Sequence, residues 1–455
     1  MELKKNDLVT VTIDDMGKDG EGIGRYEGCA LFIKDAVIGD VVEAKIMKMK
    51  KHYGYARLMK VIKPSDKRTE PVCAFHRQCG GCQLQALAYA EQLLFKQRKI
   101  QGNLERIGHF TEISMEPIVG MEHPYHYRNK AQFPIGRDKN GRLVAGFYAG
   151  RTHDIIPNLD CALGVPENEQ ILQIVLNFMN EYTIEPYCEK DGTGLVRHVL
   201  IRKGFTSGEL MVCLIINAST LPHADALVRE LCTVKGMKSI SININHRRDN
   251  VILGEQVKLL WGSEYIHDSI GGIDYRISPL SFFQVNPVQT KKLYDLVLDF
   301  AQFTGQETVW DLYCGTGSIS LYMAAHVKEV HGVEIIPQAI EDARANALGN
   351  DIHNASFYVG RAEEVVPALY REEGIYADVI VVDPPRKGCD EALLTTMLQM
   401  APKRIVYVSC DSATLARDLR ILCDGGYRLE RVRGVDCFGQ TGHVESVCLL
   451  SKVQN

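Results

Sequence analysis

Apolar and polar side chains alternate through the first part of the chain, over residues 7–62. The alternation is clear at Val9, Val11 and Ile13, where every second residue is apolar. Glycines interrupt it at short intervals, at Gly17, Gly20, Gly22, Gly24, Gly28 and Gly39. A period of two predicts half-buried strands, and short strands bounded by glycines are typical of a small closed β-barrel. We predict such a barrel over residues 1–64.

The pattern changes in the middle of the chain, where residues 125–276 are mostly strand-like. The clearest strands are three apolar runs, at residues 196–202, 210–217 and 240–245. Helical periodicity is confined to residues 167–182 and 222–234 in this region, and another helical segment, 84–107, precedes it. This mixture predicts a central α+β domain over residues 65–286.

After about residue 287, short apolar strands alternate with amphipathic helices. The strands are predicted at residues 308–312, 329–333, 379–382 and 404–408. This rhythm is typical of βαβ units in a doubly wound parallel sheet. We therefore predict a Rossmann-like domain over residues 287–455, and an α/β protein overall.

Length and composition agree with a globular protein of several domains. At 455 residues and 45% hydrophobic content the chain is too long for one core. No run approaches the roughly 18–20 apolar residues of a membrane helix, and the first residues lack the apolar core of a signal peptide. We expect a cytoplasmic protein without a membrane partner.

The formal net charge of −5 argues against a nucleic-acid partner until charge is resolved along the chain. Between residues 45 and 68, nine basic residues stand against one acid, Asp66. The basic residues are Lys45, Lys48, Lys50, Lys51, Arg57, Lys60, Lys63, Lys67 and Arg68. His52, Tyr53 and Tyr55 lie among them, and this combination can pair phosphates and stack bases. The alternative is a solvated strand face.

A glycine-rich turn follows the first strand of the C-terminal domain. It contains Gly315 and Gly317. The second strand ends at Glu334, where a carboxylate can accept hydrogen bonds from both ribose hydroxyls of a nucleoside. NAD-dependent Rossmann enzymes share this geometry, but their third glycine is absent near Ser320. The Asp-x-x-x-Gly-x-Gly spacing resembles motif I of class I methyltransferases, which favours S-adenosylmethionine over NAD.

Two further strands of this domain end in residues suited to chemistry. One ends in Asp383-Pro384-Pro385-Arg386, where the prolines stiffen a loop that can face a flat ligand. Methyltransferases of exocyclic amines usually place an aromatic residue after the prolines, so Arg386 disfavours an amino target. The next strand ends at Cys410, which taken alone would be a small buried hydrophobe. Its position beside the ligand crevice and before a helix, which can lower a thiol pKa, favours a nucleophile.

A glutamate, Glu445, lies between valines in the last apolar run. Burial of its carboxylate is costly unless the group has a partner or takes part in the reaction. Three motifs, the last of which contains Glu445, resemble those of the RNA uracil-C5 methyltransferase family. They are Asp-Pro-Pro-Arg-Lys-Gly, Ser-Cys followed by Ala-Thr-Leu-Ala-Arg-Asp-Leu, and Val-Glu-x-Val. The resemblance extends over essentially the whole chain. The family usually has Asn-Pro where this chain has Asp411-Ser412. The RNA cytosine-C5 family instead carries a cysteine where this chain has Pro385, and we expect nearby Cys389 to be incidental.

The resemblance implies roles for particular residues. Cys410 would add to C6 of uracil as the nucleophile, and Glu445 would remove the C5 proton as the general base. Asp383 and Arg386 would orient cofactor and base. Residues 282–286, Phe-Phe-Gln-Val-Asn, match the family segment before the cofactor fold. The implied S-adenosylmethionine contacts are Gln284, Tyr313, Glu334 and Asp383, beside the turn glycines Gly315 and Gly317.

A cysteine-rich stretch precedes the central strands. Cys73, Cys79 and Cys82 supply three soft ligands around a glycine turn, and a fourth is needed to close a metal site. The resemblance identifies Cys161 as that fourth ligand and favours a [4Fe-4S] cluster, with zinc as the alternative. The spacing does not match that of radical enzymes, so we expect a structural or RNA-docking role.

The likeness extends to the N-terminal barrel, because residues 20–24 and 30–64 resemble the TRAM module, an OB-like RNA-binding barrel. The tRNA branch of the family generally lacks both the barrel and the cluster, so the resemblance indicates 23S rRNA as substrate and 5-methyluridine as product. Two alternatives stay open: a tRNA uracil-C5 methyltransferase that acquired the barrel, and an RNA-binding ribosome-assembly factor. We expect a monomer without a DNA partner.

Overall fold

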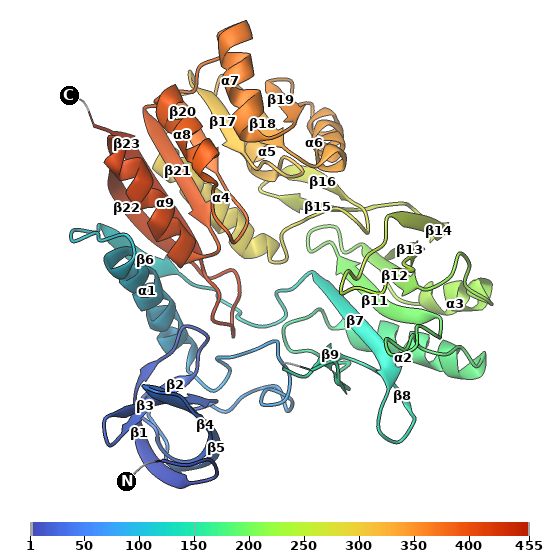
Figure 1. The fold of residues 1–455 in the computed structure, drawn as a ribbon. Coiled ribbons are helices and arrows are strands. Elements are labelled where there is room, and N and C mark those ends of the chain that lie inside the picture. The colour runs from blue at the N-terminus through green and yellow to red at the C-terminus, as the bar shows by residue number, and fades with distance from the viewer. Residues whose placement is uncertain (1–2, 151, 454–455) are drawn as a thin grey trace.

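The computed structural model describes residues 3–150 and 152–453 (Figure 1). Five N-terminal strands close a barrel in the order β1-β2-β3-β5-β4. They are β1 (Leu8–Met16), β2 (Gly22–Tyr26), β3 (Cys29–Lys34), β4 (Val41–Met49) and β5 (Tyr53–Lys63). Val9, Val11 and Ile13 are buried inside the barrel while their neighbours are exposed. A side chain at Gly24 would bring its Cβ within 2.8 Å of the Thr12 carbonyl oxygen, so the barrel needs glycine there. The predicted barrel is confirmed.

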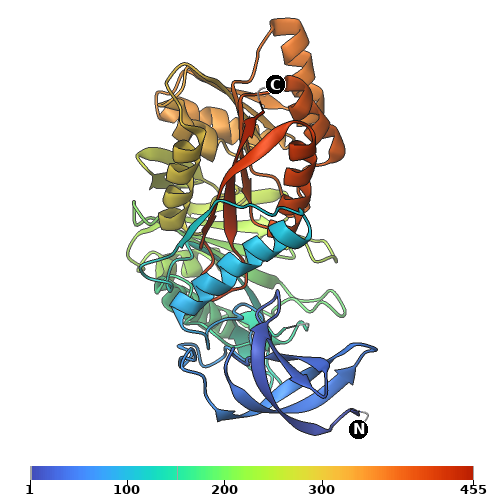
Figure 2. The same cartoon turned by 90° about the vertical axis from the view of Figure 1, so that its left-hand side faces the viewer.

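A helix and a strand leave the barrel and join the far end of the molecule. Helix α1 (Tyr89–Arg106) crosses between the barrel and the C-terminal sheet (Figure 2). Strand β6 (Met115–Val119) pairs in parallel with β22 (Tyr427–Val435) at the edge of that sheet. The sequence pattern did not predict that β6 pairs with the C-terminal sheet. The domain boundaries at residues 64 and 286 stay a prediction.

The central region is a mixed sheet in the order β14-β13-β12-β11-β7-β8. Its strands are β7 (Lys130–Arg137), β8 (Leu143–Ala145), β11 (Val196–Lys203), β12 (Leu210–Ile216), β13 (Met237–Ile244) and β14 (Gln256–Gly262). Helices α2 (Glu167–Glu181) and α3 (Ala224–Leu231) share one apolar core with this sheet. A short pair, β9 (Phe147–Tyr148) and β10 (Ile155–Ile156), lies beside it. The predicted α+β character is confirmed.

The C-terminal sheet has the order β19-β18-β17-β20-β21-β23-β22-β6. Its other strands are β17 (Thr308–Leu312), β18 (Glu329–Glu334), β19 (Ala355–Val359), β20 (Val379–Val382), β21 (Arg404–Ser409) and β23 (Glu445–Lys452). Strands β17–β21 are parallel and β23 is antiparallel to β21. The order reverses between β18 and β20 on either side of β17, and ligands bind at the carboxyl ends of strands beside such a reversal.

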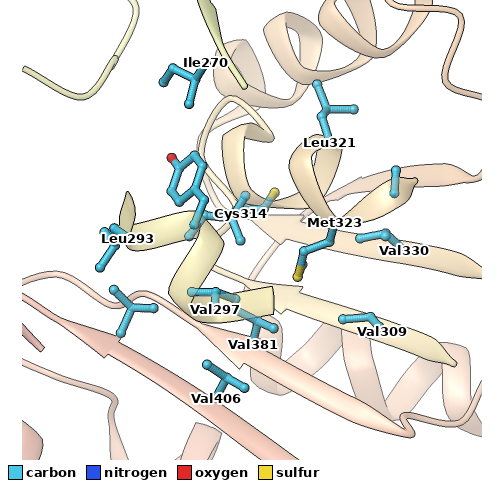
Figure 3. Packing of buried hydrophobic residues seen from close by; sticks show 14 of the residues in the cluster. Ile270, Leu293, Val297, Val309, Cys314, Leu321, Met323, Val330, Val381 and Val406 are labelled. Atoms are coloured by element: carbon cyan, nitrogen blue, oxygen red, sulfur yellow. The ribbon is translucent and has the colours of Figure 1, made fainter. Parts of the chain in front are cut away.

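Helices pack on both faces of the C-terminal sheet. Helices α4 (Pro287–Ala301), α5 (Ser318–Ala324) and α6 (Pro337–Gly349) share one core with the hairpin of β15 (Ile266–Ile270) and β16 (Ile273–Ile277). Figure 3 shows Leu293 and Val297 of α4 near Val381 and Val406 of the sheet. The second core contains α7 (Ala362–Glu373), α8 (Glu391–Met400), α9 (Ser412–Asp424) and part of α1. Nowhere in residues 3–150 and 152–453 is a helix both long and apolar enough to cross a membrane.

Candidate active site

The turn between β17 and α5 has the backbone that its glycines predict. Tyr313, Gly315 and Gly317 have φ angles of 66°, 55° and 77°, in the left-handed region that favours glycine. A Cβ at Gly317 would also lie 3.0 Å from the Phe357 ring, so glycine allows close packing there. A Cβ at Gly315 would meet no heavy atom within 4 Å, so the turn is open on that side.

Carboxylates surround this turn. Glu334, at the end of β18, accepts hydrogen bonds from the backbone N–H groups of Gly315 at 3.3 Å and Ile336 at 3.0 Å. Asp311 is buried beneath the turn and accepts a hydrogen bond from the Ser320 hydroxyl at 2.5 Å. Burial, with Asp383 and Glu334 nearby, raises the pKa of Asp311 to about 7. Asp311 was not among the predicted cofactor contacts, although it opens the Asp-x-x-x-Gly-x-Gly motif.

The predicted segment around Gln284 lies beside the same turn. The Thr316 hydroxyl donates to the Phe282 carbonyl oxygen at 3.5 Å. From the central sheet, the Asn129 side chain donates to the Gln284 carbonyl oxygen at 3.0 Å. The half-buried Gln284 is therefore held between the central region and the glycine turn.

The Asp383-Pro384-Pro385-Arg386 loop follows β20 and is tied to α9. The Thr414 hydroxyl donates to the Arg386 carbonyl oxygen at 3.1 Å. Burial raises the pKa of Asp383 to about 6, whereas the Arg386 side chain is exposed. Cys389 is buried, and its thiol lies 3.4 Å from the Tyr407 hydroxyl.

Cys410 lies between β21 and α9 and is half-buried. Asp411 caps the helix by accepting hydrogen bonds from the Ala413 and Thr414 N–H groups at 2.9 and 3.3 Å. This capping carboxylate accounts for the local turn without the family's Asn-Pro. Burial, followed by the charges of Glu445 and Asp383, raises the pKa of Cys410 to about 11. The helix start therefore does not bring the pKa of this thiol below its ordinary value, because burial raises it and the neighbouring acidic groups add to the rise.

Glu445 is the first residue of β23 and is only 8% exposed. Ser409 of β21 pairs with Ser446 of β23, so Cys410 and Glu445 are the next opposing positions at this edge. Burial and the charge of Asp383 raise the pKa of Glu445 to about 8, while Arg386 lowers it. The structure therefore brings together a thiol, two carboxylates and a guanidinium, from three separate loops. A carboxylate of this pKa can exchange a proton near neutral pH.

The four predicted metal ligands are Cys73, Cys79, Cys82 and Cys161. The charges of Cys73, Cys79 and Cys161 each contribute to raising the pKa of Cys82 to about 12, after burial. Within the part of the chain that the structure describes, however, no group of three or more histidine, cysteine or acidic side chains is arranged to hold a metal.

Comparisons with known proteins identify the family to which the chain belongs. The family model of the tRNA (Uracil-5-)-methyltransferases matches residues 88–453, and that of the TRAM domain matches residues 3–59. Proteins described as uncharacterized RNA methyltransferases are 50% identical over 449 residues in Halalkalibacterium halodurans and 46% over 454 in Clostridium acetobutylicum. Each match covers 98% of the relative, and 98% and 99% of this chain, respectively.

A solved structure extends the comparison to the whole molecule. The Pyrococcus abyssi tRNA (uracil-54, C5)-methyltransferase, in complex with S-adenosyl-L-homocysteine, superposes with a TM-score of 0.78 at 27% identity. The match covers 97% of this chain and 100% of that chain. With the barrel, the glycine turn and the family match together, this chain belongs to the tRNA (Uracil-5-)-methyltransferase family of S-adenosylmethionine-dependent RNA methyltransferases.

Proposed function

We propose that this protein methylates C5 of a uridine in 23S rRNA, forming 5-methyluridine through a covalent adduct with Cys410. The proposal rests on one observation: Cys410 and Glu445 occupy opposing positions at the carboxyl end of β21. The charges of Asp383 and Arg386 act on both of them. A nucleophile and a base at opposing positions are what this reaction needs, because C5 of uracil alone is a poor nucleophile.

The steps assign one task to each residue. The Cys410 thiolate adds to C6, and the C5=C6 electron pair moves to form an enolate through C4 and O4. C5 of that enolate takes the methyl group. Glu445 then removes the C5 proton, the enolate re-forms the C5=C6 bond, and the thiolate leaves. Arg386 lowers the pKa of both Cys410 and Glu445, so we expect it to favour their charged forms.

S-adenosylmethionine supplies an electrophilic methyl group when it is bound. We propose that the carboxylate of Glu334 binds its ribose and that Gly315 and Gly317 let the backbone approach it. Gln284, Tyr313 and Asp383 would complete the contacts around the turn.

The substrate RNA would also contact the barrel. Lys48, Lys51 and Lys60 of the basic stretch are exposed, and Lys48 of β4 pairs with Tyr55 of β5. The rings of Tyr53 and Tyr55 lie 5.6 Å apart. Two other cations of the stretch have structural partners: Arg68 forms an ion pair with buried Asp40 at 2.6 Å, and Lys67 with Glu91 at 3.1 Å. We therefore expect lysines of β4 and β5 to bind phosphates, and Arg68 to stabilise the barrel exit.

We further propose that Cys73, Cys79, Cys82 and Cys161 hold a [4Fe-4S] cluster, with zinc as the alternative. Four soft thiolates suit either group, and their mutual electrostatic effects support a common site. Protein purified without oxygen should bind iron and sulfide. One equivalent of zinc without sulfide would contradict the cluster.

A second candidate substrate is tRNA. The family description and the Pyrococcus abyssi enzyme both name tRNA, and the latter match is long enough to include the barrel. The barrel alone therefore does not separate the two RNA classes.

Methyl transfer from labelled S-adenosylmethionine onto 23S and tRNA transcripts tests the proposal. We expect 5-methyluridine in the 23S transcript. Methylation of the tRNA transcript alone would contradict 23S rRNA as the substrate and identify tRNA instead. An assembly factor would bind 23S rRNA without transferring the methyl group. A 23S fragment containing 5-fluorouridine should trap the covalent complex on a denaturing gel, because Glu445 cannot remove fluorine as it removes a proton.

A further inference from the structure

The loop between β22 and β23, residues 436–444, leads directly into Glu445. It begins at Asp436 and is held by side chains from a distant part of the chain, residues 83–99. That part comprises the segment that follows Cys82 and the first part of α1. The proposed base is therefore supported by a region that contributes no residue to the proposed chemistry.

The centre of this support is a pair of buried amides. The Gln92 side chain of α1 donates to the Gln440 side-chain oxygen at 2.9 Å, and the Gln440 backbone N–H donates to Gln92 Oε1 at 3.1 Å. The two residues are 1% and 2% exposed. Gln440 has a φ of 68°, a backbone angle that residues other than glycine rarely adopt. Its conformation thus depends on these partners.

The segment after Cys82 holds the same residue from the other side. The backbone N–H groups of Gln83 and Leu84 both donate to the Gln440 carbonyl oxygen at 3.0 Å. The Gln92 amide also donates to the Leu84 carbonyl oxygen at 3.0 Å, so one side chain joins both segments. Further along the loop, Lys99 of α1 donates to the Gly442 carbonyl oxygen at 2.8 Å.

The start of the loop is fixed by a buried ion pair. Lys96 lies 2.6 Å from Asp436, and neither side chain is exposed. The Tyr89 hydroxyl donates to the other Asp436 oxygen at 2.8 Å. A buried pair of charges stabilises a fold only weakly compared with apolar residues, but it demands one geometry. Both ends of the loop are therefore held in register with α1.

We propose that Gln92 and Gln440 are positioning residues that hold Glu445 for removal of the C5 proton. The inference rests on the proposed function, because it assigns these residues to one step of that reaction. Glu445 follows Gln440 by five positions, whereas Cys410 lies on a separate element, between β21 and α9. Loosening the loop should therefore slow proton removal while thiol addition and methyl transfer continue.

The test is Gln92→Ala on the full-length protein, with ordinary 23S fragment and S-adenosylmethionine. A displaced base should lower kcat by about 10- to 100-fold, since a shift of roughly 1 Å has that effect. KM for RNA should stay unchanged. The methylated covalent complex should accumulate on a denaturing gel with ordinary uridine, as with Glu445→Gln. Trapping by 5-fluorouridine should keep its wild-type rate.

Two further variants make the result decisive. Gln101→Ala changes an exposed glutamine of the same helix, and it should leave turnover and adduct level unchanged. Gln440→Gly suits the positive φ and keeps the backbone hydrogen bonds while removing the side-chain amide, so it tests the pair if Gln92→Ala does not fold. Unchanged turnover in the folded variants, or a parallel loss of turnover and trapping, would overturn the positioning role. Failure of the wild-type protein to form any trapped complex would instead contradict the proposed function.

Discussion

The two halves of the site are assembled in different ways. The centre of the cofactor half is local, because Asp311, the glycine turn and Glu334 belong to two neighbouring strands and are joined by short-range hydrogen bonds. In the reactive half, Cys410 and Glu445 come from antiparallel neighbours, and the loop before Glu445 is fixed by Gln92, which is 348 residues from Gln440. The glycine turn and Glu334 therefore depend on neighbouring strands, whereas the loop before Glu445 depends on a helix far away in the sequence.

The difference also separates their electrostatics. Glu334 is stabilised by backbone N–H groups, a favourable environment for a charged carboxylate. Glu445 and Cys410 are buried near other acidic groups, so the pKa of each is raised. Glu334 is thus surrounded by backbone donors, whereas Glu445 and Cys410 are surrounded by acidic neighbours. Substitutions in the two halves should consequently affect different kinetic constants.

The largest effect is expected for Cys410→Ala. Loss of the thiol removes the only group at this edge assigned to attack C6, so methylation and 5-fluorouridine trapping should both fall by more than about 10³-fold. Binding of S-adenosylmethionine, measured by calorimetry, should persist because the glycine turn is untouched. Methylation that survives this change would require direct transfer to C5 without an adduct.

Glu445→Gln should have the next largest effect, and of a different kind. The amide cannot accept the C5 proton, so turnover should fall by about 10²- to 10⁴-fold. Addition and methyl transfer precede that step, and the methylated adduct should therefore accumulate on ordinary uridine. Mass spectrometry of the protein–RNA complex measures it. A variant that loses activity without an adduct would show that Glu445 acts earlier.

The pH dependence of adduct breakdown tests the raised pKa directly. With a pKa of about 8, Glu445 is protonated in acid and gains its base form as the pH rises. The ionised fraction grows from about 1% at pH 6 to about half at pH 8, so breakdown should accelerate roughly 50-fold. Pulse-labelled adduct chased at each pH gives this rate. A flat profile between pH 6 and 8 would mean that another group takes the proton.

The glycine turn could be predicted from the sequence because its signals are local. Apolar strands, a glycine turn and a following carboxylate occur within a short stretch, and each reports on its own backbone. The reactive residues were identified by motif resemblance, but their surroundings were not. The raised pKa of Cys410 depends on Glu445 and Asp383, which arrive from other strands. Strand β6 pairs with a strand far away in the sequence, and so does Lys96 with Asp436. Neither contact can be predicted from the pattern of apolar and polar residues.

The smallest expected effect is that of Glu334→Gln in the cofactor half, and it separates binding from chemistry. Glutamine keeps the size and one acceptor oxygen, so it can keep the hydrogen bond from Gly315, whereas the bond from Ile336 and the negative charge of the carboxylate are lost. Hydrogen bonds to charged groups contribute about 1.5–3 kcal/mol, which predicts a rise of at least about tenfold in KM for S-adenosylmethionine. At saturating cofactor, kcat and the trapping rate should match the wild type, because Cys410 and Glu445 are unchanged. Glu329→Gln is the matched control, since Glu329 lies at the opposite end of β18 and accepts a hydrogen bond from Thr308 at 2.6 Å. If Glu334→Gln lowered kcat while KM stayed constant, the two halves would be coupled through this carboxylate, and the separation between them would not hold.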